Sequence, residues 1–288
     1  MRQLLHVTTA LACLLAGLSR AEALVLAGSD LLGEPVREAL QAELKKAGLD
    51  VDFSLEGSLL GLEDLQSGES DACLLAVPDE SGKPLELRNF PVAFQIVTFL
   101  VNAASPVTEI SYVQLAGLYG GKGTLDGWSS LTSDPEWASR KVSLWATRAE
   151  NSVALEIFNS MVLGGGALKP TVRFVKGGDD AVQAVLVDDA SALVVAPATF
   201  KEASAVRILA VKSGQERQAF TPSPDNVLFG DYPLRLPFHL VVRDGLSDEL
   251  VAKLVRAVYS PAVTKALQAS SWMPIPETER RTILSQYD

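Results

Sequence analysis

The sequence predicts an α/β fold with two lobes, in which the second lobe is inserted in the first. Short apolar runs alternate with helical patterns along most of the chain, which is typical of a sheet covered by helices. Two apolar stretches, 90–102 and 228–243, are long for strands confined to one sheet, so we expect them to cross between the lobes. The predicted division is an N-terminal segment at 1–23, the first lobe at 24–97 and 228–288, and the second lobe at 98–227.

The first element pair places hydroxyl groups where strands end. An apolar strand at 24–27 stops at Gly28-Ser29-Asp30, an amphipathic helix follows, and a second strand at 51–55 stops at Gly57-Ser58. Backbone N–H groups at a helix N-terminus are unpaired and attract anions. Ser29 and Ser58 are therefore candidate anion-binding residues, and Asp30 is included as the neighbour of Ser29 in the same turn. The alternative is that both serines are ordinary helix caps.

The next elements contain the carboxylate of Asp71 and a glycine-rich turn that is not a nucleotide site. A short helix ends at Gly68, and Asp71 leads into an apolar strand at 72–77, followed by a polar loop at 78–89. Ser111 and Gln114 form a capping-box pattern for a helix that runs to a glycine-rich turn at 120–123. That turn lacks the Ser or Thr that a phosphate loop requires after its lysine, so we reject a nucleotide site.

A third strand end carries a cation. The strand at 142–146 is followed by Arg148, Asn151 and Ser152 and then by a helical pattern. We expect Arg148 and Ser152 to contribute to the same anion site, although Arg148 could instead form a surface salt bridge with Glu150. The remaining predicted strands are 171–175, 191–196 and 206–212, and the remaining predicted helices are 179–187, 247–259, 261–269 and 277–284.

The N-terminus predicts export. Arg2 precedes an apolar run at 4–18, and Ala21-Glu22-Ala23 fits the small-x-small rule, so we expect a signal peptide cleaved after Ala23 and a soluble periplasmic or secreted protein. A lipid anchor at Cys13 is an alternative with a poor motif. Without Cys13, Cys73 is the single cysteine, which excludes an intrachain disulfide.

Composition excludes several function classes. The formal charge is −10, from 25 basic and 35 acidic residues, which argues against nucleic acid as a partner. No Ser-His-Asp set, nucleophile elbow or His/Cys metal cluster is visible, so we expect neither an enzyme nor a bound cofactor or metal. His239 lies in a strand-like run and is interpreted as a core or wall residue.

Several stretches, taken in order, resemble the phosphate-binding proteins of bacterial ABC importers, which have the type 2 periplasmic binding protein fold. They are the Gly28-Ser29-Asp30 start and the segments at 56–72, 101–128, 148–152 and 230–242 with the SPAVTKAL run that follows. The resemblance implies an oxyanion held between two lobes, a membrane permease as partner and a monomer. We also expect the lobes to close about a hinge near 96–101 and 228–236.

The resemblance assigns the ligand roles by position. Hydroxyl and N–H donors fall to Ser29, Ser58, Asn151 and Ser152, the cation to Arg148, and the carboxylate that accepts a proton from the bound anion to Asp71. The match is partly degenerate, because Leu59, Val153 and Ala154 stand where the family has Gly, Gly and Thr. Two functions follow: a phosphate receptor, or a receptor-like module with a decayed site that acts as a sensor or through protein contacts.

Overall fold

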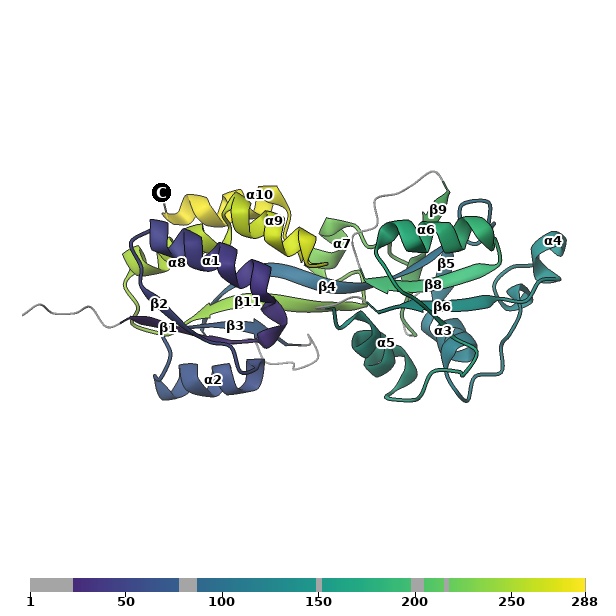
Figure 1. Cartoon of the computed structure of the whole chain (residues 1–288), viewed down its shortest axis with the longest axis horizontal. Coiled ribbons are helices and arrows are strands. Elements are labelled where there is room, and N and C mark those ends of the chain that lie inside the picture. Colours follow the sequence, from purple (N-terminus) through teal and green to yellow (C-terminus); the bar gives the residue numbers. More distant parts are fainter. Residues whose placement is uncertain (1–22, 78–86, 149–151, 198–204, 215–217, 288) are drawn as a thin grey trace, which may run out of the picture.

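The computed structural model describes residues 23–77, 87–148, 152–197, 205–214 and 218–287. The predicted signal peptide, which contains Cys13, lies outside these residues except for Ala23. Figure 1 shows two lobes side by side, joined by long strands, which confirms the predicted fold class. Within the described ranges, no helix is both long enough and apolar enough to cross a membrane.

The sheet of the first lobe is covered by helices on both faces. Its strand order is β2-β1-β3-β11-β4, and β11 runs antiparallel to both of its neighbours. The strands are β1 (Leu24–Gly28), β2 (Val51–Ser54), β3 (Ala72–Ala76), β11 (Arg235–Val242) and the lobe 1 part of β4 (Arg88–Asn102). One face carries α1 (Glu34–Lys46), α8 (Asp248–Val258), α9 (Pro261–Ala269) and α10 (Glu277–Leu284), and the other carries α2 (Ser58–Ser67) (Figure 1). The short elements η1 (Asp30–Leu32), β12 (Met273–Pro274) and η4 (Ser285–Tyr287) complete the lobe.

The second lobe continues the same sheet on the other half of β4. Its strands are β8 (Ala192–Pro197), β6 (Ser143–Thr147), β7 (Arg173–Val175) and β9 (Val206–Ile208), with a separate pair formed by β5 (Glu109–Ser111) and β10 (Ala210–Lys212). Its helices are α3 (Tyr112–Tyr119), α4 (Pro135–Ala138), α5 (Ala154–Leu163), α6 (Asp179–Asp188) and the 3-10 turn η3 (Trp128–Ser130). The predicted strand at 206–212 is two strands, because β9 pairs with β4 whereas β10 pairs with β5.

Of the strands that the structure describes, β4 continues from the first lobe into the second. It pairs with β11 as far as Ile96 and with β8 from Val97 onward. The carbonyl of Val97 accepts a hydrogen bond from the hydroxyl of Tyr232, and its N–H donates to the carbonyl of Leu234 at 3.1 Å. Tyr232 is fully buried, and this burial raises the pKa of its phenol well above the usual value. The return chain is thus fixed to β4 at the point where the lobes meet.

The second predicted crossing stretch is shorter in the structure. Residues 228–229 belong to α7 (Pro224–Phe229), and only Arg235–Val242 forms a strand. The helix begins because the Ser223 hydroxyl accepts from the N–H of Asn226 at 3.2 Å and Pro224 suits the first turn. It ends at Gly230, which is in the left-handed conformation. The apolar pattern concealed these local start and stop signals.

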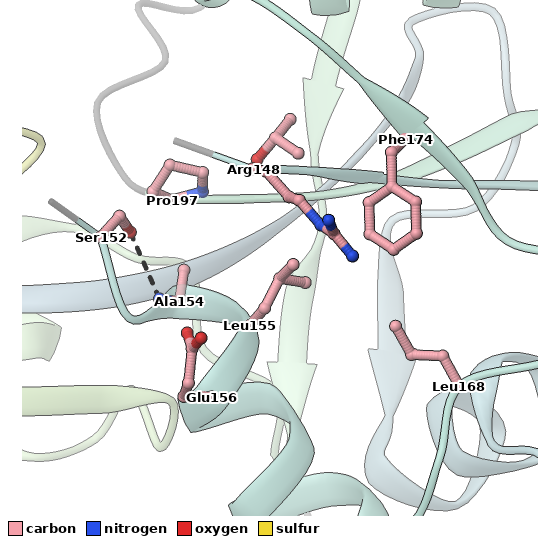
Figure 2. A pocket seen from close by; sticks show the side chains of 9 residues that line it. Arg148, Ser152, Ala154, Leu155, Glu156, Leu168, Phe174 and Pro197 are labelled. Carbon is pink, nitrogen blue, oxygen red and sulfur yellow. Dashed lines mark hydrogen bonds between the residues drawn. The ribbon is translucent and has the colours of Figure 1, made fainter. Parts of the chain in front are cut away.

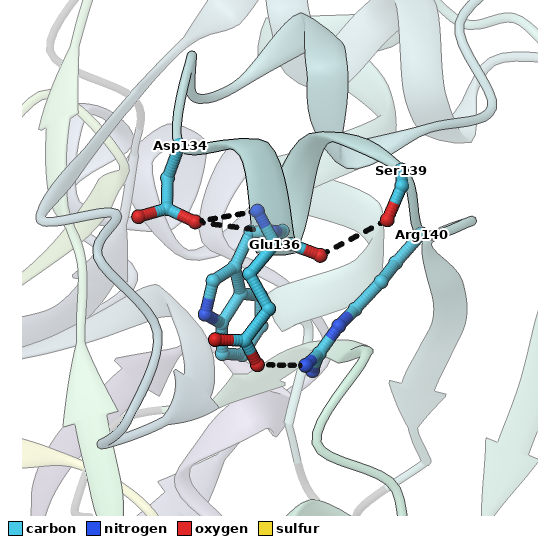
Figure 3. A network of polar contacts seen from close by, with 5 residues as sticks. Asp134, Glu136, Ser139 and Arg140 are labelled. Carbon is cyan, nitrogen blue, oxygen red and sulfur yellow. Dashed lines mark hydrogen bonds and ion pairs between the residues drawn. The ribbon is translucent and has the colours of Figure 1, made fainter.

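A polar cluster at the far end of the second lobe is structural. One oxygen of Asp134 accepts from the N–H groups of Glu136 and Trp137 at 3.0 and 3.1 Å, which caps α4 (Figure 3). Arg140 pairs with Glu136 at 2.5 Å and lies over the Trp137 ring at 4.5 Å. The Trp137 ring packs edge-on against the fully buried Trp128. These contacts fold the segment between η3 and β6.

Candidate functional site

The strand directions bring the candidate residues to two facing sheet ends. β4 runs from the first lobe to the second, and β11, β8 and β6 run back toward the first lobe. β3, β1 and β2 run in the direction of β4. The carboxyl ends of β1, β2 and β3 therefore point at the second lobe, and the carboxyl end of β6 points at the first (Figure 1). Ligands of open α/β sheets bind at such ends.

The first half of the site carries the two predicted serines. Ser29 is buried, and its hydroxyl oxygen accepts from the N–H of Leu31 at 3.2 Å, so it caps the 3-10 turn and not α1. The hydroxyl oxygen of Ser58, in the first turn of α2, accepts from the N–H of Ala76 at 2.9 Å. Each hydroxyl keeps its own proton for donation to a ligand. Asp30 is exposed within the 3-10 turn.

Glycines allow α2 to lie directly on the strand ends and so position Ser58. A Cβ atom on Gly61 would lie 2.5 Å from the Cα atom of Gly28 and 2.8 Å from the sulfur of Cys73. The N–H of Gly57 donates to the carbonyl of Gly28 at 2.8 Å. Burial beneath this contact raises the pKa of the Cys73 thiol to about 12, so Cys73 is a protonated core residue and not a nucleophile.

The second half of the site is a cavity at the end of β6. It encloses about 380 Å³ and is lined by Thr147, Arg148, Ser152, Ala154, Leu155, Glu156, Leu168, Phe174 and Pro197. Figure 2 shows the Arg148 guanidinium pointing into the space between Phe174, Leu155 and Leu168. It lies over the Phe174 ring at 4.2 Å, a cation–π contact that leaves the N–H edges of the guanidinium available.

The start of α5 supplies the polar wall of this cavity. The hydroxyl of Ser152 accepts from the N–H of Ala154 at 3.2 Å, as drawn in Figure 2. The N–H of Val153 donates to the side-chain oxygen of Gln95 at 2.7 Å, which ties α5 to the crossing strand. The first intrahelical bond runs from the N–H of Ile157 to the carbonyl of Val153 at 2.9 Å. The N–H groups of Leu155 and Glu156 come before this first bond, so they have no carbonyl partner within the helix.

Asp71 lies at the opposite end of the sheet, which corrects its predicted place in the site. It precedes β3, whereas Ser29 and Ser58 follow β1 and β2. One carboxylate oxygen pairs with Arg243 at 2.6 Å, and the other accepts from the N–H of Val25 at 3.0 Å. Asp71 therefore joins the start of the sheet to the end of β11, which is a structural role.

Sequence reasoning missed the other residues that line the cavity. Asn151, which the sequence assigns to the site, and Glu150, the alternative partner of Arg148, lie outside the described residues. Phe174 and Glu156 line the cavity and were not predicted. Strand alternation could have indicated Phe174, because an apolar residue near the carboxyl end of β7 is a neighbour of Arg148 if β6 and β7 pair in parallel.

In the part of the chain that the structure describes, no group of His, Cys, Asp and Glu could hold a metal ion.

Comparison with known proteins agrees with the two-lobed fold. The family model described as a PBP superfamily domain matches residues 16–261. Protein SphX of Synechococcus elongatus is 22% identical over 271 residues, which cover 90% of this chain and 79% of that protein. The structure of a possible phosphate binding protein from Planctomyces limnophilus is similar with a TM-score of 0.68 at 17% identity, over 92% of this chain and 96% of that one. An ABC-type phosphate transport receptor from Vibrio cholerae gives a TM-score of 0.58 at 20% identity, over 88% of this chain and all of that one (100%).

Proposed function

Because this chain belongs to the PBP superfamily, we propose that it is an extracytoplasmic solute receptor that closes its two lobes on an oxyanion, with phosphate as the ligand. The family and the fold are those of binding proteins and not of enzymes. The Vibrio cholerae protein of the same fold is an ABC-type phosphate transport receptor. By analogy, this chain acts as a monomer that presents its ligand to the permease of an ABC importer.

The observation that carries the proposal is the position of Arg148. Its guanidinium lines a cavity at the end of β6, beside the first turn of α5, and is held there by the ring of Phe174. A planar guanidinium can donate two parallel hydrogen bonds to an oxyanion, each of roughly 1.5–3 kcal/mol. The helix N-terminus adds N–H donors and a favourable dipole.

Closure would complete the site from the first lobe. Ser29 and Ser58 follow β1 and β2, whose carboxyl ends point toward the second lobe, and each has a hydroxyl proton to donate. In the closed state, the anion would bridge donors from both lobes, so binding and closure are thermodynamically coupled. The predicted closure at 96–101 and 228–236 stays a prediction, and it includes Val97 and Tyr232.

The deciding experiment is calorimetric titration of the purified protein with phosphate, sulfate and arsenate, after bound anions are removed by dialysis. We expect a micromolar dissociation constant for phosphate, about −8 kcal/mol. Arg148→Gln should weaken binding by at least about 100-fold, as expected for two charge-assisted hydrogen bonds. Arg173→Gln is the matched control, since Arg173 also lies over an aromatic ring, that of Trp145, without lining the cavity. Equal losses in both variants would contradict the proposal.

A second function is favoured by a specific observation. Leu59, Val153 and Ala154 replace small or hydroxylated residues of the resembled family, and Leu59 is 74% exposed at the start of α2. These changes suit a receptor-like module that has lost its ligand and works as a sensor or through protein contacts. No binding heat with any of the three anions, in the wild type and in Arg148→Gln alike, would favour this function over the receptor.

A further inference from the structure

We infer that the oxyanion this site selects carries a small apolar substituent, as in an organic phosphonate or a phosphate monoester. The inference rests on the proposed function, because it takes Arg148 as the anchor of the anionic group. It concerns the rest of the cavity, which the oxyanion alone does not fill.

The cavity is larger than an inorganic oxyanion. The cavity encloses about 380 Å³, which is within the range of roughly 300–1,000 Å³ for small-molecule sites. One water molecule takes up roughly 30 Å³ of liquid, and a tetrahedral oxyanion has only five heavy atoms. Inorganic phosphate at Arg148 would therefore leave most of the cavity to water.

Apolar side chains form much of the cavity wall. Leu155, Leu168 and Phe174 surround the guanidinium in Figure 2, and Pro197 lines the same cavity. Phe174 is 38% exposed, although it is a large aromatic residue in a strand. Contact between apolar surface and water is unfavourable. A ligand with an apolar group next to its charge would cover this surface while its anionic end binds Arg148.

The first lobe also carries exposed apolar side chains next to a candidate donor. Leu59 and Leu60 are exposed by 74% and 49% in the first turn of α2, next to Ser58. This turn rests on the carboxyl ends of β1 and β3, which point toward the second lobe. Each lobe thus combines donors for an oxyanion with apolar side chains at its strand ends, which is the pattern expected for an amphiphilic anion.

The test compares phenylphosphonate, methylphosphonate and inorganic phosphate by calorimetric titration of the purified protein. We expect phenylphosphonate to bind at least tenfold more tightly than phosphate, with methylphosphonate between them. Arg148→Gln should abolish binding of all three ligands. Leu155→Ala and Leu59→Gly should each lower the ratio of phenylphosphonate to phosphate affinity by about threefold or more. Val187→Ala is the control, since Val187 is 59% exposed on α6 and does not line the cavity.

The outcomes separate this inference from the function on which it rests. Equal affinity of the wild-type protein for phosphate and phenylphosphonate, lost in Arg148→Gln, would overturn the inference and leave the oxyanion receptor standing. No binding of any probe would overturn both. If Leu155→Ala and Leu59→Gly weaken phosphate and phenylphosphonate equally, the apolar walls serve lobe closure and not the ligand. Phenylphosphonate binding that survives Arg148→Gln would place the ligand elsewhere and also overturn the inference.

Discussion

At the scale of single residues, charge is used differently at the two ends of the first-lobe sheet. At the end that faces away from the cavity, Asp71 has both oxygens engaged, one by Arg243 and one by the N–H of Val25. Its side chain is 25% exposed, so the pair is partly shielded from water. A carboxylate held in this way contributes to stability and is too far along β3 to contact an anion at Arg148.

We expect Asp71→Ala to lower the free energy of unfolding by about 1–3 kcal/mol, because it leaves the N–H of Val25 without its acceptor and Arg243 without its charge partner. Chemical denaturation measures this loss. The ratio of phosphate to sulfate affinity should stay unchanged. Asp248→Ala is the control, since the pair of Asp248 with Arg88 is exposed and should contribute at most about 1 kcal/mol. An altered anion ratio with unchanged stability would restore Asp71 to the site.

The sequence indicates at which end of the sheet each candidate residue lies, provided that one notes whether the residue precedes or follows its strand. Ser29, Ser58 and Arg148 follow β1, β2 and β6, whose carboxyl ends point toward the other lobe, and their role as a shared anion site stays a prediction. Asp71 precedes its strand, and this alone assigns it to the opposite end of a parallel sheet. Phe174 could not be predicted from its own segment, because its role depends on the pairing of β7 with β6.

At the scale of elements, the start of α2 is positioned by contact between backbones. Gly61 and Gly28 touch where the helix crosses the end of β1, and there is no room for a side chain between them. Ser58 is fixed in the same turn by its bond to Ala76. The packing of one helix on one strand thus decides where a candidate ligand donor stands.

We expect Gly61→Ala to destabilise the protein by about 1–3 kcal/mol, the typical cost of overpacking a tight contact. Anion affinity should fall as well, because the helix must move away from β1 and take Ser58 with it. Thermal unfolding and calorimetric titration measure the two effects. Gly178→Ala is the matched control, since a Cβ atom there meets nothing within 4 Å. A variant of Gly61 with wild-type stability would contradict this account of the contact.

Elements with strong local patterns were predicted well, and those defined by distant partners were not. The helix of 13 residues at Glu34–Lys46 and the strand at Arg88–Asn102 follow from periodicity and length. The division of 206–212 into β9 and β10 depends on which strand each half pairs with, and periodicity carries no such information. The short helix α7 was missed because its apolar residues were assigned to the neighbouring strand.

At the scale of the whole molecule, buried phenols hold the frame of both lobes. Tyr119 donates to the carbonyl of Leu193 at 2.7 Å, Tyr232 to that of Val97, and Tyr259 to that of Pro91 at 2.7 Å. Burial raises the pKa of all three phenols above the usual value. The folded protein therefore keeps these protons at alkaline pH values where the unfolded chain releases them.

The sign of this linkage gives a prediction for alkaline pH. A group with a raised pKa in the folded state contributes its full stability below its ordinary pKa, about 10 for tyrosine, and loses it as the pH rises above that value. Each phenol should lower the free energy of unfolding by about 1.4 kcal/mol per pH unit above pH 10.

We expect Tyr232→Phe to be less stable than the wild type by about 1 kcal/mol at pH 8, through the lost bond to Val97. The deficit should shrink and disappear as the pH rises from 10 to 11, because phenylalanine has no proton to lose. Urea denaturation at several pH values measures both curves, and Tyr119→Phe should change the slope in the same way. Parallel curves for the wild type and Tyr232→Phe would contradict the prediction.

The place of β11 between β3 and β4 also governs the order in which the molecule is assembled. The strand that closes the sheet of the first lobe comes from the last quarter of the chain, and the Asp71–Arg243 pair joins residues 172 positions apart. The strands of the second lobe beyond β4 lie between these segments, so they are synthesised earlier. Until β11 arrives, β3 and β4 each present an open edge to which other chains could pair. The lobe that is synthesised first is thus the one that is completed last.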